Sequence, residues 1–467
     1  MMNVTITRIL YINRTRIGDS NGTGEIWSWG NVMKQVMFTL WLVNVLMANP
    51  LFADVGELAF SFSENASGGV AVARIDRITG KLLDSQKLFD ERDCRQPLKV
   101  RRVGEYGDLV VTNLDKKGPH LFVVDRLRRQ TRRILLSAVP DELRIFGDKG
   151  FVTCDQDVLA VVNLQTAQVV SEWDVSDSFD PPANAPEDVY ITQDQHYAVV
   201  SFQKDSRRGT KQGSRLAIYR LPEADRIADL QLPRDHPELH IHGNLKEQGP
   251  SPEVIYVSPE TNTLLVTLDL YGAVGVMDWG DARLGKRVHW EIISTAISGE
   301  LGTAFPDRGC AVKMAGEDCF LVCNAGKPGG SALIGLNQRK ALWKATTPPG
   351  LESPVFFPDL KKAYSVCSGK TKARRGGQIE KEYFPRKSLY IFDFSSPESL
   401  LSKTVQQIQF DDFVQRIAKV KSARPLLLLA LGPRPEGATQ LAMFDPVAGK
   451  IINQIPAPGV IGRFESE

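Results

Sequence analysis

A short pattern that returns about every 53 residues restricts this chain to a repeat architecture more tightly than any other feature of its sequence. Each copy consists of an extended apolar stretch that ends in a polar residue, then a polar turn, then a second extended stretch. The clearest copies end their first stretch at Asp76, Asn163 and Asp445, and weaker copies place Asp125, Arg220, Asp278, Asn337 and Asp393 in the same column. Asp76 and Asp445 are 369 positions and seven intervals apart, which gives the period.

Further strands precede each copy and complete a unit of four. Residues 264–267 form an apolar run ahead of one copy, and residues 253–257 form another strand before that run. Eight such units predict an all-β propeller of eight four-stranded blades, with seven blades as the alternative. The first unit lacks its leading strand, and residues 460–464 have the character to supply it. We therefore expect the C-terminal strand to close the ring and remove an exposed sheet edge.

The Asp or Asn at the end of each third strand is explained by the turn that follows it. A short side-chain acceptor can receive hydrogen bonds from backbone N–H groups two residues further on, and Gly80 and Gly449 can adopt positive φ. We interpret this column as structural rather than catalytic.

Several segments resemble a known group of repeats. They are the segment of residues 186–200, the Val-Val-Thr-Asn tetrad that ends at Asn113, and the Thr-Gly-Lys turn at Gly80. These segments are similar to the YVTN-repeat and quinoprotein-amine-dehydrogenase-like propellers of exported proteins, although the tetrad begins with Val110 rather than Tyr. The resemblance covers residues 54–467 and implies architecture rather than activity. The sequence contains no haem-attachment motif, P-loop, G-x-S-x-G elbow or adjacent cysteine pair.

The N-terminal region has the order of an export signal. Lys34 precedes an apolar run over residues 37–47, and Ala53 follows at the expected cleavage point. A membrane span needs about 20 apolar residues, which argues against the alternative of an uncleaved anchor. We expect residues 1–32 to be a mis-called or disordered N-terminal extension, residues 33–53 to be a signal peptide that begins at Met33, and residues 54–467 to be a periplasmic or secreted propeller.

Charge is informative only locally. The net charge of +2 and the pI of about 8.1 do not favour nucleic acid as a partner. Two long loops between second and third strands are basic, however, and their cations are Lys204, Arg207, Arg208, Lys211, Lys372, Arg374, Arg375 and Lys381. We expect both loops on one face, where they would bind an acidic protein, an anionic ligand or an envelope component. Solvated loops without a partner are the alternative.

Histidine and cysteine suggest two further sites. His236, His240 and His242 lie in one blade connection and are candidate ligands for a divalent transition metal, with a polar loop as the alternative. If residues 310–323 form a hairpin that turns through residues 315–318, Cys310 lies opposite Cys323. The sequence leaves open whether these two cysteines form a disulfide or remain free thiols.

The tryptophans on outer strands are expected to pack between blades rather than to stack on a quinone. The leading hypothesis for function is a non-catalytic binding or scaffold propeller with a basic face, because no catalytic set is recognisable. The alternative is a periplasmic enzyme, either a lactonase-type hydrolase or a quinone-linked oxidoreductase, with its site at the channel mouth.

Overall fold

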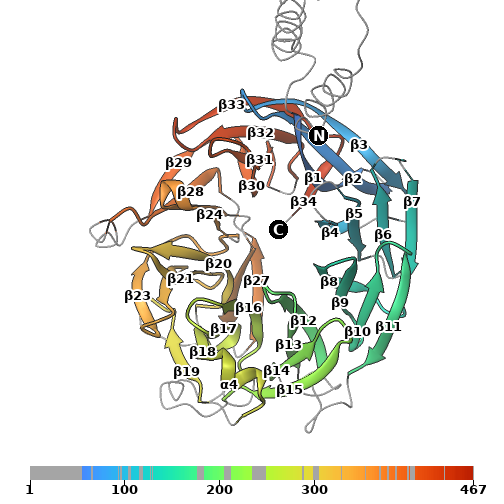
Figure 1. The fold of residues 1–467 in the computed structure, drawn as a ribbon. Helices are drawn as coiled ribbons and strands as arrows, with labels where there is room; N and C mark the ends of the chain where they lie inside the picture. Colours follow the sequence, from blue (N-terminus) through green and yellow to red (C-terminus); the bar gives the residue numbers. More distant parts are fainter. Residues whose placement is uncertain are drawn as a thin grey trace, which may run out of the picture. The chain divides into compact units, whose positions relative to one another are not determined.

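A computed structural model shows an eight-bladed β-propeller, as predicted from the repeat (Figure 1). It describes residues 55–465 except 65–66, 93, 95–96, 104–106, 115–118, 127, 129, 176–183, 205–211, 234–248, 287–288, 298–303, 328, 353, 368–369, 376–377, 384–385, 397–398, 400–404 and 436. The predicted signal peptide and the extension before it lie outside these residues. Within them, no helix is long and apolar enough to cross a membrane.

Each blade is an antiparallel sheet of four strands, which are given below from the innermost strand at the central axis to the outermost strand. Blades 1 to 4 consist of β34 (Val460–Phe464), β1 (Val55–Glu64), β2 (Ser67–Asp76) and β3 (Lys81–Glu91); β4 (Pro97–Arg102), β5 (Leu109–Asn113), β6 (His120–Asp125) and β7 (Gln130–Leu135); β8 (Pro140–Phe146), β9 (Lys149–Cys154), β10 (Val158–Asn163) and β11 (Gln168–Asp174); and β12 (Asn184–Ile191), β13 (Tyr197–Lys204), β14 (Gln212–Arg220) and β15 (Asp225–Gln231).

Blades 5 to 8 follow the same order. They consist of β16 (Pro252–Ser258), β17 (Thr263–Leu268), β18 (Ala273–Asp278) and β19 (Glu291–Ser294); β20 (Pro306–Met314), β21 (Glu317–Asn324), β22 (Ser331–Gly335) and β23 (Lys340–Ala345); β24 (Val355–Phe357), β25 (Lys362–Val366), β28 (Ser388–Asp393) and β29 (Gln406–Gln409); and β30 (Phe413–Lys419), β31 (Leu427–Gly432), β32 (Gln440–Asp445) and β33 (Lys450–Pro456). Short helices are η3 (Asp269–Tyr271), α4 (Trp279–Arg283) and η4 (Pro358–Leu360).

The C-terminal strand closes the ring, which confirms the prediction. β34 pairs antiparallel with β1 and supplies the innermost strand of blade 1. Two hydrogen bonds also join the outer strands of blades 8 and 1. The Asn453 side chain accepts from the Leu82 backbone N–H at 3.0 Å and donates to the Leu82 carbonyl at 2.8 Å. The seam between the chain ends is therefore held both at the axis and at the rim.

The polar column at the end of the third strands shapes turns, as expected. Asp76 Oδ1 accepts hydrogen bonds from the N–H groups of Ile78 and Thr79, and Gly80 follows with a φ of 70°. Asp445 makes the equivalent pair of hydrogen bonds in blade 8. Both carboxylates accept backbone hydrogen bonds that hold the turn, which is the structural role expected for this column.

Large side chains fill the spaces between neighbouring blades. Trp173 of blade 3 packs against Tyr219 of blade 4, with ring centroids 6.1 Å apart, and Trp343 of blade 6 packs edge-on against Phe392 of blade 7. Burial of such apolar surface is the main source of stability of the ring. The prediction that the tryptophans serve packing is confirmed for these two.

A side-chain hydroxyl near the end of most second strands organises the innermost strands. Thr153 Oγ1 accepts from the Glu142 N–H at 3.2 Å, where β8 bulges, and donates to the Glu187 carbonyl of the next blade at 3.2 Å. Acceptors from an innermost-strand N–H recur in other blades, and they are Ser61, Thr112, Ser201 and Thr267. A β-bulge is left with an unpaired amide, and the hydroxyl satisfies it.

Two details differ from the sequence-based expectation. The hairpin of β20 and β21 turns through two residues, Ala315 and Gly316, so Cys310 lies opposite Leu321, and Cys323 lies opposite Arg308. Both cysteines are free thiols, and the expected opposition of Cys310 and Cys323 is wrong because the tighter turn shifts the register by two. The basic insertion of blade 7 contains a hairpin, β26 (Lys370–Arg375) and β27 (Gln378–Tyr383), where only a loop was expected.

Replacing the hydroxyl of Thr153 should destabilise the ring. In Thr153→Val the isosteric methyl group leaves a buried amide and a buried carbonyl without their partner, so the free energy of unfolding should fall by about 2 kcal/mol. Urea denaturation checks this, with Thr153→Ser expected to retain most of the stability. Thr131→Val on the outermost strand β7 is the matched control, and an equal loss in that variant would contradict the role of the bulge.

Candidate functional site

The central channel contains a cavity of about 910 Å³ near one face of the ring. Its wall includes Arg102 and Ile145 near the ends of β4 and β8, and Val55 at the start of β1. These positions adjoin the turns that join first to second strands. The cavity therefore lies toward the face on which first strands are joined to second strands, opposite to the ends at which second strands lead into third strands.

One register level of the innermost strands supplies much of the wall. In blades 2 to 5 the residue two pairs beyond the hydroxyl is Arg101, Arg144, Tyr190 and Tyr256 in turn. In blade 6, where Cys323 takes the place of the hydroxyl residue, it is Cys310. In blade 1 the same level is occupied by Glu465, whose N–H donates to the Ala59 carbonyl. All six of these residues line the cavity.

The arginine of blade 2 is held rigidly by its neighbours. Arg101 Nη2 lies 2.7 Å from Glu142 Oε1, its Nε donates to the Leu143 carbonyl, and Lys99 binds the other oxygen of Glu142. Burial opposes ionisation of this carboxyl, but the charges of Arg144 and Arg101 outweigh burial and hold the pKa of Glu142 below its ordinary value. The network fixes the position of a cation at the wall.

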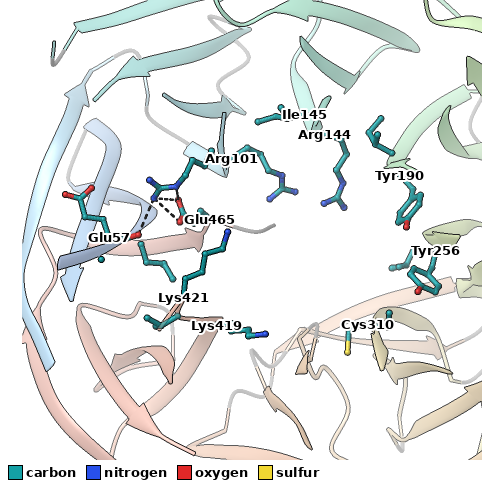
Figure 2. Close-up of a pocket in the computed structure, with 18 of the residues that line it drawn as sticks. Glu57, Arg101, Arg144, Ile145, Tyr190, Tyr256, Cys310, Lys419, Lys421 and Glu465 are labelled. Atoms are coloured by element: carbon teal, nitrogen blue, oxygen red, sulfur yellow. Dashed lines mark hydrogen bonds and ion pairs between the residues drawn. The ribbon is translucent and has the colours of Figure 1, made fainter. Parts of the chain in front are cut away.

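The arginine of blade 3 is less completely occupied. Arg144 Nε donates to the Val189 carbonyl at 3.0 Å, and its Nη2 lies 3.5 Å from Asp188 Oδ1. Burial raises the pKa of Asp188 despite the neighbouring guanidinium. Figure 2 shows the side chains of Arg101 and Arg144 extending into the cavity.

Two more carboxylates pair with arginines on the wall over blades 1 and 2. Arg102 binds Glu465 through Nη2, at 3.0 and 2.8 Å from the two carboxylate oxygens, and Arg126 is paired with Glu57. Burial raises the pKa of Glu465, an effect that the adjacent guanidinium of Arg102 only partly offsets. Lys419 and Lys421 extend this basic wall into blade 8.

The wall over blades 4 to 6 has a different character. Tyr190 and Tyr256 contribute phenol rings, with Ile255 and Phe320 nearby. The Tyr190 hydroxyl donates to the Val257 carbonyl at 3.2 Å. Burial raises the pKa of Cys310, so its thiol stays protonated at neutral pH and is a poor nucleophile.

Further along the channel, one buried carboxylate binds arginines from three other blades. Glu352 accepts from Arg416 of blade 8 at 2.9 Å and from Arg463 of blade 1 at 3.0 Å, and Arg308 of blade 6 lies 3.8 Å away. Arg308 also pairs with Asp307 at 2.9 Å, so the cluster contains carboxylates as well as cations. This cluster links the blades on both sides of the ring closure.

Some of the predicted binding residues belong to described strands, and the others do not lie in the described part of the chain. His236, His240, His242, Arg207, Arg208 and Lys211 lie outside the described residues, and the metal and partner predictions that rest on them stay predictions. Lys372, Arg374 and Arg375 belong to β26, Lys381 to β27 and Lys204 to the end of β13. Both basic segments connect a second strand to a third, as predicted.

The sequence contained a signal for the cavity that the motif search missed. Five innermost strands contain a proline, and the fourth residue after each proline is Arg101, Arg144, Tyr190, Tyr256 or Cys310. Alignment of the repeats on these prolines places the five cavity residues in one column. Without the register, however, a charged residue in an innermost strand cannot be assigned to the channel.

Comparison with solved structures supports the fold. The chain is similar to the dihydro-heme d1 dehydrogenase NirN in complex with DHE, with a TM-score of 0.61 and 12% identity over 88% of this chain and 74% of that one. It is also similar to apo AztD from Citrobacter koseri, with a TM-score of 0.53 and 13% identity over 88% of this chain and 98% of that one. A third similar structure is BamB from Moraxella catarrhalis, with a TM-score of 0.50 and 9% identity over 79% of this chain and 92% of that one.

Sequence comparison adds no closer relative. No family model matches the chain, and no curated protein matches it. At identities of 9 to 13% the structural similarity establishes the β-propeller fold alone. The propeller prediction is confirmed, and the narrower resemblance to YVTN repeats stays a prediction.

Neutralising the buried carboxylate of blade 3 should destabilise the protein in a pH-dependent way. Because the pKa of Glu142 is lowered in the folded state, its stabilising effect is present above the ordinary pKa of about 4.3 and is lost as the pH falls further. Glu142→Gln should therefore lower the free energy of unfolding by about 3 kcal/mol at pH 7, since it leaves buried cations unpaired.

Denaturation of wild type and variant between pH 7 and pH 3 measures this difference, which should shrink toward the acid end. Glu260→Gln, which removes an exposed partner of Lys313, is the control and should cost less than about 1 kcal/mol at every pH. A difference that is independent of pH would contradict the assignment.

Proposed function

We propose that this protein is a binding propeller that holds a small, multiply charged anion in its central cavity. The observation that carries the proposal is the charge of the cavity wall, where the acidic side chains are Glu57, Asp188 and Glu465 and the basic ones are Arg77, Arg101, Arg102, Arg126, Arg144, Lys419 and Lys421. Among the described residues of the wall, these seven cations and three anions give an excess of four positive charges, whereas the whole chain has a net charge of +2.

The geometry favours an anion over other ligands. Low-dielectric walls strengthen the field of a charged cleft and raise the local concentration of counter-ions. Guanidinium groups form forked hydrogen bonds with carboxylate and phosphate groups. The arginines of the wall are positioned by protein carboxylates and backbone carbonyls before a ligand arrives, which lowers the entropic cost of binding.

The enzyme hypothesis has weaker support from the channel. Carboxylates from blades 3, 4 and 1 face the axis with shifted pKa values, and they are Glu142, Asp188 and Glu465. Each is paired with an arginine, and no histidine is found among the described residues of the cavity wall. The neighbour NirN is a dehydrogenase. A lactonase-type hydrolase or a quinone-linked oxidoreductase is therefore retained as the alternative for this chain.

The proposal also includes a cellular location and a second binding surface. We infer from the apolar segment at residues 37–47 that the mature protein works in the periplasm or outside the cell. The basic segments of blades 4 and 7 connect second strands to third strands, whereas the cavity adjoins the connections of first to second strands. They are proposed as a separate surface for an acidic protein or an envelope component.

Calorimetric titration with pyrophosphate and with citrate tests the central proposal. Both anions should bind the wild type, and removal of two cations in the Lys419→Ala, Lys421→Ala double variant should weaken binding about a hundredfold, because each charged contact contributes about 1.5 kcal/mol. Binding should also weaken as salt rises.

A double variant on the outer strands provides the control. Lys340 and Lys450 are exposed at the starts of β23 and β33, and Lys340→Ala with Lys450→Ala removes the same charge far from the cavity wall. Its affinity for both anions should equal that of the wild type. Absence of binding to the wild type, or an equal loss in the control, would refute the proposal.

A further inference from the structure

We propose that Glu465 is a built-in competitor for the anion of the central cavity, so that only a ligand with several charges gains enough attraction to displace it. This inference rests on the proposed function and concerns the selectivity of the same site. It assigns a role to the residue that directly follows the ring-closing strand.

The position of Glu465 is fixed by the closing strand. Its backbone N–H donates to the Ala59 carbonyl at 2.8 Å and continues the pairing of β34 with β1. Its carboxylate binds Arg102, with Nη2 at 2.8 and 3.0 Å and Nε at 3.2 Å. About a fifth of each side chain is exposed, so the ion pair forms part of the cavity surface rather than of the core.

Its place in the register sets Glu465 apart from the equivalent residues. At the same level, blades 2 to 7 supply two arginines, two tyrosines, a cysteine and a phenylalanine, and these residues are Arg101, Arg144, Tyr190, Tyr256, Cys310 and Phe356. Blade 8 has Ala418 at this level, so among the eight blades the carboxylate at this level comes from blade 1. A protein anion thus occupies a guanidinium on the wall that an anionic ligand would otherwise reach.

Competition of this kind discriminates by ligand charge. A ligand with one negative charge that displaces Glu465 exchanges one carboxylate for another on Arg102 and gains little. A ligand with two or more charges can also pair with a second cation of the same wall, and Arg144 and Lys419 are among these cations. The net gain therefore grows with ligand charge, and the ligand class is a small polyphosphate or polycarboxylate.

Titration of wild type and Glu465→Gln with pyrophosphate and with acetate tests the inference. The glutamine keeps the shape of the side chain and removes its charge. Both ligands must displace Glu465 from Arg102, so both affinities should rise by about the same factor, about tenfold, within the range of typical coupling energies. Acetate, which gains little in the wild type, should then bind measurably. Glu291→Gln, which loses its partner Arg339 on the outer strand β19, is the control and should leave both affinities unchanged.

The possible results separate this inference from the proposed function. Binding to Glu465→Gln alone, or tighter binding to it, supports the competitor role. Unchanged or weaker pyrophosphate binding in Glu465→Gln, with wild-type binding that depends on Lys419 and Lys421, overturns the competitor role and leaves the proposed function standing. Failure of both proteins to bind overturns both. If Glu465→Gln does not fold, Glu465→Asp decides, because its shorter side chain withdraws the charge from Arg102 and should raise the affinity less.

Discussion

The hydrogen bond between a second-strand hydroxyl and a bulged innermost strand is the interaction on which the channel depends. In blades 1, 3 and 4 the hydroxyl accepts from its own innermost strand and donates to a carbonyl of the next blade, and these residues are Ser61, Thr153 and Ser201. One small side chain thus satisfies a bulge and links two blades. Hydrophobic packing holds the blades together, but it does not fix which innermost residues face the axis.

The bulges position the polar residues of the innermost strands. Glu142 and Asp188 have their N–H groups bound to this hydroxyl column, and Arg463 has the same role in the closing strand. Carboxylates at this level hold arginines that face the cavity. A buried ion pair is a weak source of stability, because desolvation offsets most of the attraction. The pairs are better explained as a means of positioning cations at a site that receives an anion.

The repeat predicted the architecture because every blade uses the same turn. Asp76 and Asp445 accept from the backbone in the same way, and the missing first strand predicted the closure by β34. The residues of the cavity wall were not predicted. The long basic loops stand out in the sequence, whereas the wall consists of single residues in short strands. The error for Cys310 and Cys323 has the same origin, since one assumed turn length set the whole register.

The central claim is that the channel binds an anion on the wall formed by blades 8, 1, 2 and 3. A crystal of the protein soaked in selenate, measured at the selenium absorption edge, tests this claim most directly, since the anomalous signal locates the anion without prior assumptions. We expect a peak in the cavity within hydrogen-bonding distance of Arg144 or Lys419. Peaks only on the outer surface of the ring, with none in the cavity, would contradict it.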